Sequence, residues 1–144
     1  MLNQVVRKSQ GGFTLVELMI TVIVISLLAM VAIPAYNDSI RKGRRSDAKS
    51  TLANVAARQE QYFMDNKTYA ASPGDLGMAS ASTDNHYTVT ITGATATTFV
   101  AKAQPVAEDP ECQTLTLDQS GTRGVEAGTS PATAAPEWDA EACW

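Results

Sequence analysis

The feature that most constrains this chain is an apolar run of 21 residues, from Phe13 to Ile33, with a single ionisable side chain, Glu17. A helix of about 20 apolar residues is long enough to span the hydrocarbon core of a bilayer. A carboxylate inside such a span is costly unless it finds a partner, so it is by default a functional candidate. The sequence therefore predicts a membrane-inserted helix with a functional carboxylate near its start.

The helical pattern does not end with the apolar run. Pro34 lacks the N–H that would bond the Met30 carbonyl, so a kink is predicted there. Beyond it, apolar residues recur at three- and four-residue spacings along one face. We predict one helix over about residues 14–63, with soft points at Pro34 and Gly43 and an amphipathic second half.

The rest of the 144-residue chain has room for one modest domain. Residues 64–85 have the composition of a loop, and alternating apolar residues predict strands at 87–91, 98–103 and 112–118. Residues 124–137 show no period. We therefore expect an α+β fold with a polar leader over 1–12, a membrane half-helix over 13–36 and a globular domain over 37–144. That domain divides into helix 37–63, loop 64–85, sheet 86–124 and a C-terminal region bounded by the cysteines at 112 and 143.

The two cysteines, Cys112 and Cys143, both follow the apolar segment. Two cysteines beyond a membrane segment favour one disulfide in an oxidising compartment. A metal site or a redox pair is the alternative, but it lacks ligands, because the chain has a single histidine, His86, and no close cysteine spacing. A disulfide is the prediction.

The charges disagree on which compartment the domain faces. Arg7 and Lys8 place the N-terminus in the cytoplasm, whereas a basic cluster from Arg41 to Lys49 pulls the other end inward. The disulfide decides for an outside domain. The cluster is then either a solvated or headgroup-facing surface or a set of salt bridges to neighbouring copies. A cleaved signal peptide is the rival for residues 1–35, but the apolar run is too long for one.

Composition narrows the functional classes. The net charge of −4 argues against general nucleic-acid binding. The sequence has no nucleophile elbow and no metal-ligand spacing, so we expect neither an enzyme nor a metal or cofactor site. A membrane-anchored enzyme remains the third class considered, after a structural subunit and a DNA-binding module.

The segment Gly11-Gly12-Phe13-Thr14-Leu15-Val16-Glu17 resembles the class III leader junction of type IV pilins. The resemblance implies that a prepilin peptidase cuts after Gly12 and that Phe13 is then N-methylated. It also implies that Glu17 sets the register of assembly by pairing with the N-terminal amine of a neighbouring subunit. A Glu17 that snorkels to the interface is the structural alternative.

The resemblance extends to Pro34 and to the region bounded by Cys112 and Cys143. It implies a long helix on a four-stranded antiparallel sheet, and a pilus subunit most similar to a PilE-type minor pilin that primes assembly for twitching motility and adhesion. The implied partners are other pilins, the peptidase, the assembly machinery and the inner membrane, with no nucleic acid. The implied locations are the bacterial inner membrane with a periplasmic domain, and then the extracellular pilus. A major pilin, a type II secretion pseudopilin and a DNA-uptake pilin are the alternatives.

Overall fold

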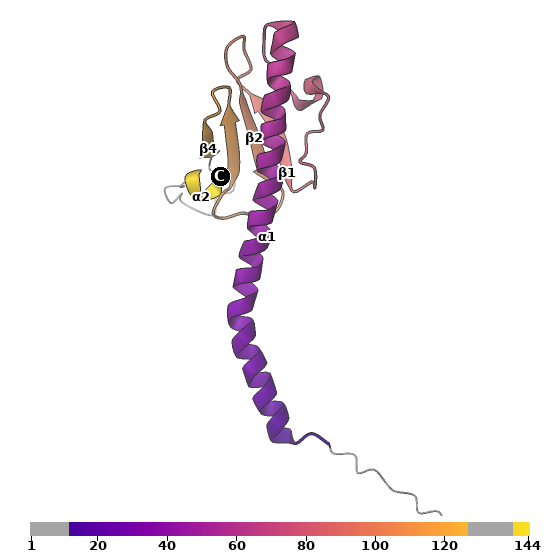
Figure 1. The fold of residues 1–144 in the computed structure, drawn as a ribbon, viewed down its shortest axis with the longest axis vertical. Helices are drawn as coiled ribbons and strands as arrows, with labels where there is room; N and C mark the ends of the chain where they lie inside the picture. The colour runs from indigo at the N-terminus through magenta and orange to yellow at the C-terminus, as the bar shows by residue number, and fades with distance from the viewer. Residues whose placement is uncertain (1–11, 127–139) are drawn as a thin grey trace, which may run out of the picture. The chain divides into compact units, whose positions relative to one another are not determined.

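A computed structural model describes residues 12–126 and 140–144, and the chain divides into two units, Met1–Ser39 and Ile40–Trp144. Most of the predicted leader and much of the C-terminal region, including Pro136 and Trp138, thus lie outside the described residues. The described elements, in chain order, are the helix α1 (Leu15–Asn66), the 3-10 helix η1 (Pro73–Leu76), the strands β1 (Tyr87–Thr92), β2 (Val100–Pro105), β3 (Thr114–Asp118) and β4 (Arg123–Glu126), and the short helix α2 (Ala140–Cys143) (Figure 1).

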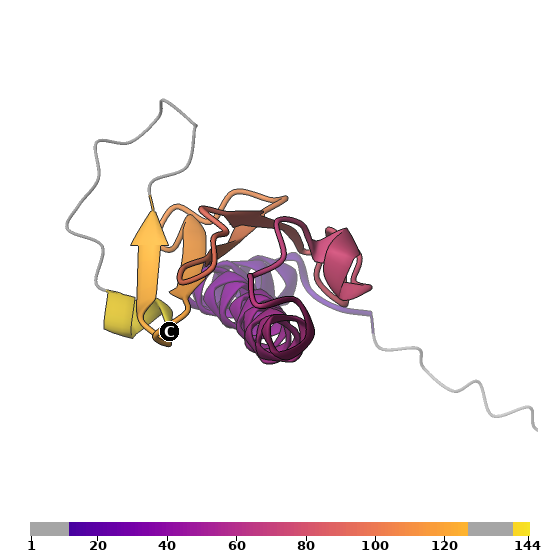
Figure 2. The same ribbon diagram turned by 90° about the horizontal axis from the view of Figure 1, so that it is seen from above.

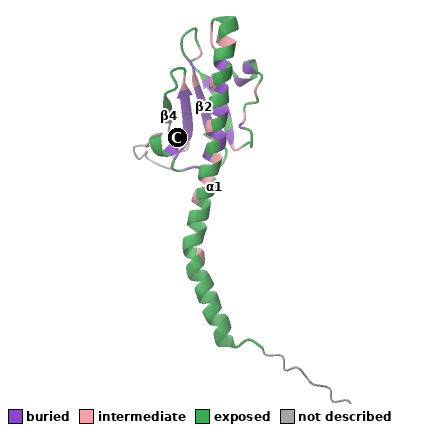
Figure 3. Cartoon of the chain, in the orientation of Figure 1, coloured by how far each residue is buried: buried purple, intermediate pink, exposed green. Residues whose placement is uncertain are grey.

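The first unit holds the apolar part of α1. Its large apolar side chains are exposed, from Leu15 at 76% to Ile33 at 60%, and this part of the helix is almost wholly exposed in Figure 3. α1 continues through Pro34 without a break in its assignment. The predicted helix over 14–63 is therefore present with slightly later ends, and the kink at Pro34 stays a prediction.

In the second unit, the later part of α1 packs on one face of a sheet (Figure 2). Ala48, Leu52 and Val55 are fully buried there, at three- and four-residue spacings that place them on one side of the helix. They meet an inner face of the sheet that includes Val89 and Leu115. The amphipathic pattern read from the sequence is thus the packing face of the domain.

The sheet is an antiparallel meander with strand order β1-β2-β3-β4. The register brings Val89 beside Ala103, Ala103 beside Leu115, and Leu115 beside Val125. Side chains alternate across a sheet, so these four residues share the face toward α1. The long helix, the four-stranded antiparallel sheet and the α+β class are confirmed.

β1 and β2 end slightly later than predicted, at Thr92 and Pro105, and two strands begin later. β2 begins at Val100 rather than 98, because the Thr95 hydroxyl accepts hydrogen bonds from the amides of Thr97 and Thr98 and closes a turn. β3 begins at Thr114 rather than 112, because the Cys112 amide donates to Asp109. β4 extends the sheet past the predicted limit of 124.

The loop after α1 is fixed to the helix by Gln59. This fully buried side chain donates to the Ala70 carbonyl at 2.9 Å and accepts from the Ala70 amide at 2.8 Å. A buried amide with both groups bonded is satisfied, and one that loses a partner is costly. Gln59 therefore holds the segment before η1 against α1.

Candidate assembly helix and C-terminal disulfide region

The first turn of α1 is closed by a reciprocal pair, Thr14 and Glu17. The Glu17 carboxylate accepts from the Thr14 amide and the Thr14 hydroxyl, both at 3.1 Å, and the Glu17 amide donates to the Thr14 hydroxyl at 3.2 Å. This is a capping box, in which two orphan donors at a helix start are satisfied by each other's side chains. A threonine three residues before a glutamate is the signal for it, but the box was not recognised from the sequence alone.

The other polar side chains of the apolar segment are satisfied within the helix. The Thr21 hydroxyl donates to the Glu17 carbonyl, and the Ser26 hydroxyl donates to the Val22 carbonyl at 2.7 Å. Because lipid offers no hydrogen bonds, such internal bonding lowers the cost of a hydroxyl in a bilayer. α1 is the one described helix long and apolar enough to cross a membrane.

The predicted processing residues lie just before this helix. Gly12 and Phe13 precede the first residue of α1, and Phe13 is 91% exposed. Among the described residues, apart from its neighbour in the chain, no heavy atom lies within 4 Å of the place that a Cβ atom on Gly12 would take. Space in the chain itself therefore does not require glycine at this position.

The C-terminal region is closed by the predicted disulfide. Cys112 and Cys143 are bonded, with their Cα atoms 5.6 Å apart, and both are buried. The bridge joins the segment just before β3 to α2, which adjoins β4. Closing a loop of this length removes roughly 3–4 kcal/mol of unfolded-state entropy in the loop-closure model. The bridge ties the chain terminus to the sheet.

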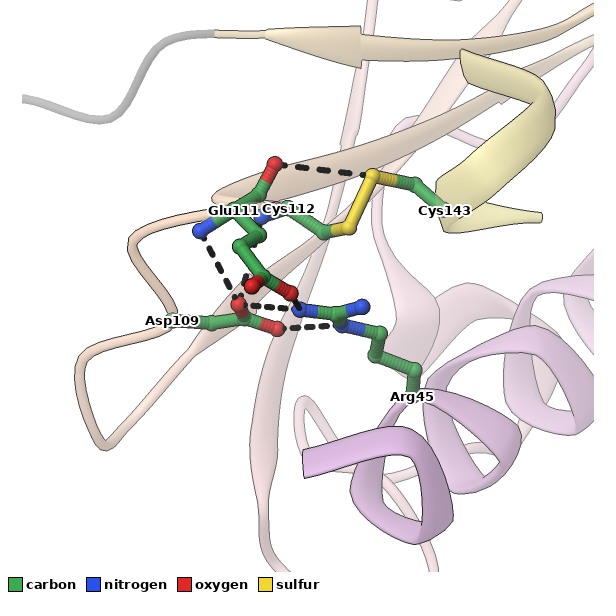
Figure 4. A network of polar contacts seen from close by, with 5 residues as sticks. All are labelled: Arg45, Asp109, Glu111, Cys112 and Cys143. Carbon is green, nitrogen blue, oxygen red and sulfur yellow. Dashed lines mark hydrogen bonds and ion pairs between the residues drawn. A yellow bond between two sulfur atoms is a disulfide. The ribbon is translucent and has the colours of Figure 1, made fainter. Parts of the chain in front are cut away.

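Beside the disulfide lies a buried ion pair between α1 and the β2–β3 loop (Figure 4). Two nitrogens of Arg45, Nε and Nη2, each donate to an oxygen of Asp109 at 2.6 Å, and Nη2 also donates to Glu111 at 2.9 Å. Asp109 further accepts from the amides of Glu111 and Cys112. The hydrogen bond to Asp109 raises the pKa of Arg45, although burial opposes it. A two-point guanidinium–carboxylate contact fixes both partners in space.

The Arg45–Asp109 ion pair distinguishes Arg45 from the other residues of the basic cluster from Arg41 to Lys49. Arg45 is buried, with 5% of its side chain exposed. Lys49 is half-buried, and its pKa is lowered by burial and by the nearby charges of Arg45 and Arg123. Lys42 is exposed. The cluster therefore contains a structural arginine as well as surface charges, which neither of the two interpretations foresaw.

The terminal residue Trp144 is also part of this region. Its indole N–H donates to the Gly124 carbonyl at 3.0 Å, and the Arg123 guanidinium lies 5.3 Å from its ring centroid. Trp144 is partly buried against the core. The Trp144 side chain therefore packs against the domain and is not fully exposed.

The other chemical candidates remain minor. Within residues 12–126 and 140–144, no group of three or more His, Cys, Asp or Glu side chains is arranged to hold a metal ion. His86 is half-buried, and its carbonyl accepts from the Val106 amide. The described residues thus form a long helix with an apolar first part and a domain closed by one disulfide.

Two protein-family models match the chain. A model described as "Type IV minor pilin ComP, DNA uptake sequence receptor" matches residues 34–116, which is more than half of the chain. A model described as "Prokaryotic N-terminal methylation motif" matches residues 7–33. The two matches adjoin and together cover the helix and most of the sheet.

Similar proteins agree with these matches. The fimbrial protein EcpC of Eikenella corrodens is 28% identical over 82% of this chain and 80% of its own length. Fimbrial protein Q of Moraxella bovis is 36% identical over 61% of this chain, a part that spans about half (53%) of that relative. The non-core minor pilin PilV of Neisseria meningitidis matches in structure with a TM-score of 0.52, covering 70% of this chain and 98% of PilV, and at 22% identity it supports the fold alone. This chain belongs to the type IV pilin family.

Proposed function

We propose that the chain is a structural subunit of a type IV pilus that assembles through α1. The observation that carries the proposal is the exposed apolar face of the first unit, directly after Gly11-Gly12-Phe13. Apolar side chains exposed over this length need lipid or other helices around them. A pilin meets both environments in turn, first the inner membrane with its domain in the periplasm and then the extracellular filament.

Processing prepares the helix for this transfer. A prepilin peptidase cleaves after Gly12, and the new amine of Phe13 is methylated. Glycine at the scissile bond leaves the backbone open to the enzyme, and no collision among the described residues gives position 12 another reason to be glycine. The methylation-motif match over residues 7–33 supports this step.

Glu17 then docks the subunit. In the isolated chain its carboxylate is bonded only to Thr14, one turn away, among the described residues. These local bonds leave lone pairs on the carboxylate for a second donor. The amine of a neighbouring subunit offers a positively charged donor in place of neutral ones, so ionic attraction is added to the hydrogen bond. The capping box orients the Glu17 carboxylate, and its pairing with the amine of the neighbouring subunit sets the register of assembly.

Within the pilus we propose the role of a minor pilin that primes assembly for twitching motility and adhesion, together with the major pilin and the assembly machinery. The minor-pilin description of the family model supports it. No enzymatic activity is part of the proposal. A major pilin and a type II secretion pseudopilin are the competing roles.

The test of processing is a substitution at Gly12. Replacing it with valine is expected to leave an uncut precursor, because the branched side chain blocks the scissile bond, whereas its Cβ atom has no neighbour within 4 Å among the described residues beyond the adjoining one. Electrophoresis and intact mass separate the precursor from the mature form. Normal cleavage of Gly12→Val would remove the leader assignment, and Gly43→Val, a glycine inside α1, is the matched control.

A DNA receptor is the second candidate, and the description of the matching family model favours it. The acidic net charge of −4 weighs against it, and two cations of the domain, Arg45 and Lys102, are each paired with a carboxylate. Duplex DNA binding needs several phosphate contacts from lysine and arginine. A mobility-shift titration at physiological salt decides between the two: saturable binding of a short duplex supports the receptor, and no shift supports the purely structural subunit.

A further inference from the structure

We infer that the domain carries a binding groove for an acidic saccharide, between α1 and the segment that follows η1. The groove has a volume of about 630 Å³ and is lined by four residues of α1, the first at position 50 and the last at position 58, and by seven of the loop residues 77–85, Asp84 not among them. That volume is within the ordinary range of small-ligand sites. Both walls belong to the second unit, and the loop lies beside the helix in Figures 1 and 2. The inference does not depend on the proposed pilus function.

The chemistry of the walls points to a polar ligand. Hydroxyl and amide side chains dominate the lining, among them Thr51, Asn54, Thr83 and Asn85. Most small-ligand pockets are mainly apolar with a few polar groups, so a lining of this kind favours a ligand with many hydroxyl groups. Among the lining residues no side chain is aromatic. Recognition must therefore rest on hydrogen bonds and charge rather than on stacking against a sugar face.

The charge of the groove points to an acid. Arg58 is the single charged residue in the lining, and no carboxylate lines the groove. This contrasts with a chain in which Asp and Glu outnumber Lys and Arg by 15 to 11. A groove whose lining has one cationic side chain and no carboxylate favours a ligand with one negative charge. A sugar acid, with one carboxylate among several hydroxyls, satisfies both requirements.

Arg58 is held in place for this task. Its Nη1 donates to the Leu76 carbonyl at 2.9 Å, and its Nε donates to the Asn54 side chain at 3.3 Å. Among the described residues no hydrogen bond is made by Nη2, which leaves this nitrogen to meet a carboxylate oxygen. Because two bonds already restrict the side chain, ordering it on binding costs less entropy than ordering a free arginine.

The experiment titrates the full-length chain, in detergent micelles, with three probes and follows backbone amide resonances. Glucuronate carries both a carboxylate and hydroxyls, glucose carries only hydroxyls, and acetate carries only a carboxylate. We expect saturable shifts at residues 54, 58 and 77–85 with glucuronate. Binding of the other two should be at least about tenfold weaker, because glucose lacks the carboxylate that bonds to Arg58 and acetate lacks the hydroxyls that bond to the polar walls. Equal binding of glucose, or glucuronate shifts confined to other surfaces, would overturn the inference.

Variants separate a specific site from general attraction to positive charge. Arg58→Gln is expected to weaken glucuronate binding about tenfold or more. Lys102→Gln, which removes the same charge from a residue outside the groove, should leave binding unchanged. Arg58→Gln should also enter sheared filaments normally. If Arg58→Gln binds glucuronate as well as the original chain, the groove is not the site.

A second variant guards against misfolding of the first. If the amide spectrum of Arg58→Gln is not native, Asn54→Leu takes its place, because Asn54 is an exposed residue of α1 in the same lining. It should weaken glucuronate binding with a native spectrum, and unchanged binding would overturn the inference. Loss of filament entry by a natively folded variant would instead make the groove a docking surface for another pilin.

Discussion

The carboxylate of Glu17 accepts two hydrogen bonds from Thr14, and the Thr14 hydroxyl in turn accepts one from the Glu17 amide. One glutamate therefore has two uses, as a cap for α1 and as the docking charge that we propose. The two uses require different properties of the side chain. A cap requires an oxygen acceptor, whereas docking onto an amine requires the negative charge.

Paired substitutions separate these uses. Glu17→Gln keeps an acceptor for Thr14 but removes the charge, so we expect normal processing and severe loss from the filament. Thr14→Val removes the cap and keeps the charge, at a cost of about 1 kcal/mol of helix stability, so we expect entry to continue. Immunoblots of sheared filaments and of whole cells measure both. The reverse outcome, with the Glu17→Gln variant entering and the Thr14→Val variant excluded, would mean that Glu17 acts as a cap alone.

The Arg45–Asp109 pair predicts a large stability effect. Arg45→Met is expected to lower the free energy of unfolding by about 3–5 kcal/mol, because it leaves the Asp109 carboxylate buried without its cation. Urea unfolding of the full chain in detergent, followed by tryptophan fluorescence, measures it. The matched control is Lys102→Met, which breaks the more exposed bridge to Glu126 and should cost less than about 1 kcal/mol. Equal effects of the two substitutions would contradict the structural role of Arg45.

Because the pKa of Tyr87 is raised in the folded state, we expect the free energy of unfolding to fall in alkali. Burial, together with the charge of Asp109, raises the pKa of Tyr87 to about 12, with a smaller contribution from Asp47 and opposing ones from Arg45 and Arg44. The unfolded tyrosine ionises near its ordinary value of about 10. Between these values the unfolded state loses its proton and the folded state keeps it. Stability from this group is therefore complete below about pH 10 and falls as the pH rises toward 12, by about 2 kcal/mol.

Urea unfolding at about pH 9.5 and about pH 11.5 measures this fall. Tyr87→Phe keeps the buried ring and removes the ionisation, so its stability should change less over the same interval. An identical decline in the two proteins would assign the effect to other groups.

Gly124 predicts a steric effect between β3 and β4. A Cβ atom on Gly124 would lie 2.7 Å from the Thr116 hydroxyl, across the β3–β4 pair. Gly124→Ala is expected to destabilise the domain by about 1–3 kcal/mol through overpacking. Adding Thr116→Ala removes the colliding oxygen and should restore much of the loss in thermal unfolding. Additive losses in the double variant would show that the collision is not the cause.

The helix and much of the sheet were predictable because their signals are local. The run from Phe13 to Ile33 and the three- and four-residue spacings after it define a helix without any partner. The alternation over 87–91 marks β1 in the same way. β4 was not recognised as a strand, because Arg123-Gly-Val-Glu126 is four residues long and too short to show a period.

The features of the candidate site also differ in whether a local sequence signal predicts them. The capping box is legible in Thr14 and Glu17, three residues apart. The ion pair of Arg45 could not be predicted in this way, because its partner Asp109 lies 64 residues away in the sequence. Only the packing of the β2–β3 loop brings the two side chains together. A run of basic residues shows where positive charge lies in the sequence, but only the fold determines which of these side chains is buried. The groove beside Arg58 depends on the loop path after η1 and had no signal in the sequence.

The most direct test of the central claim is the mass spectrum of the chain recovered from sheared surface filaments. If the chain is a processed pilin, its N-terminal peptide begins at Phe13 and carries one added methyl group, and Cys112 and Cys143 resist alkylation until they are reduced. Its abundance relative to the dominant pilin then assigns a minor or a major role. A chain absent from the filaments, or recovered with residues 1–12 still attached, would contradict assembly through the processed N-terminal helix.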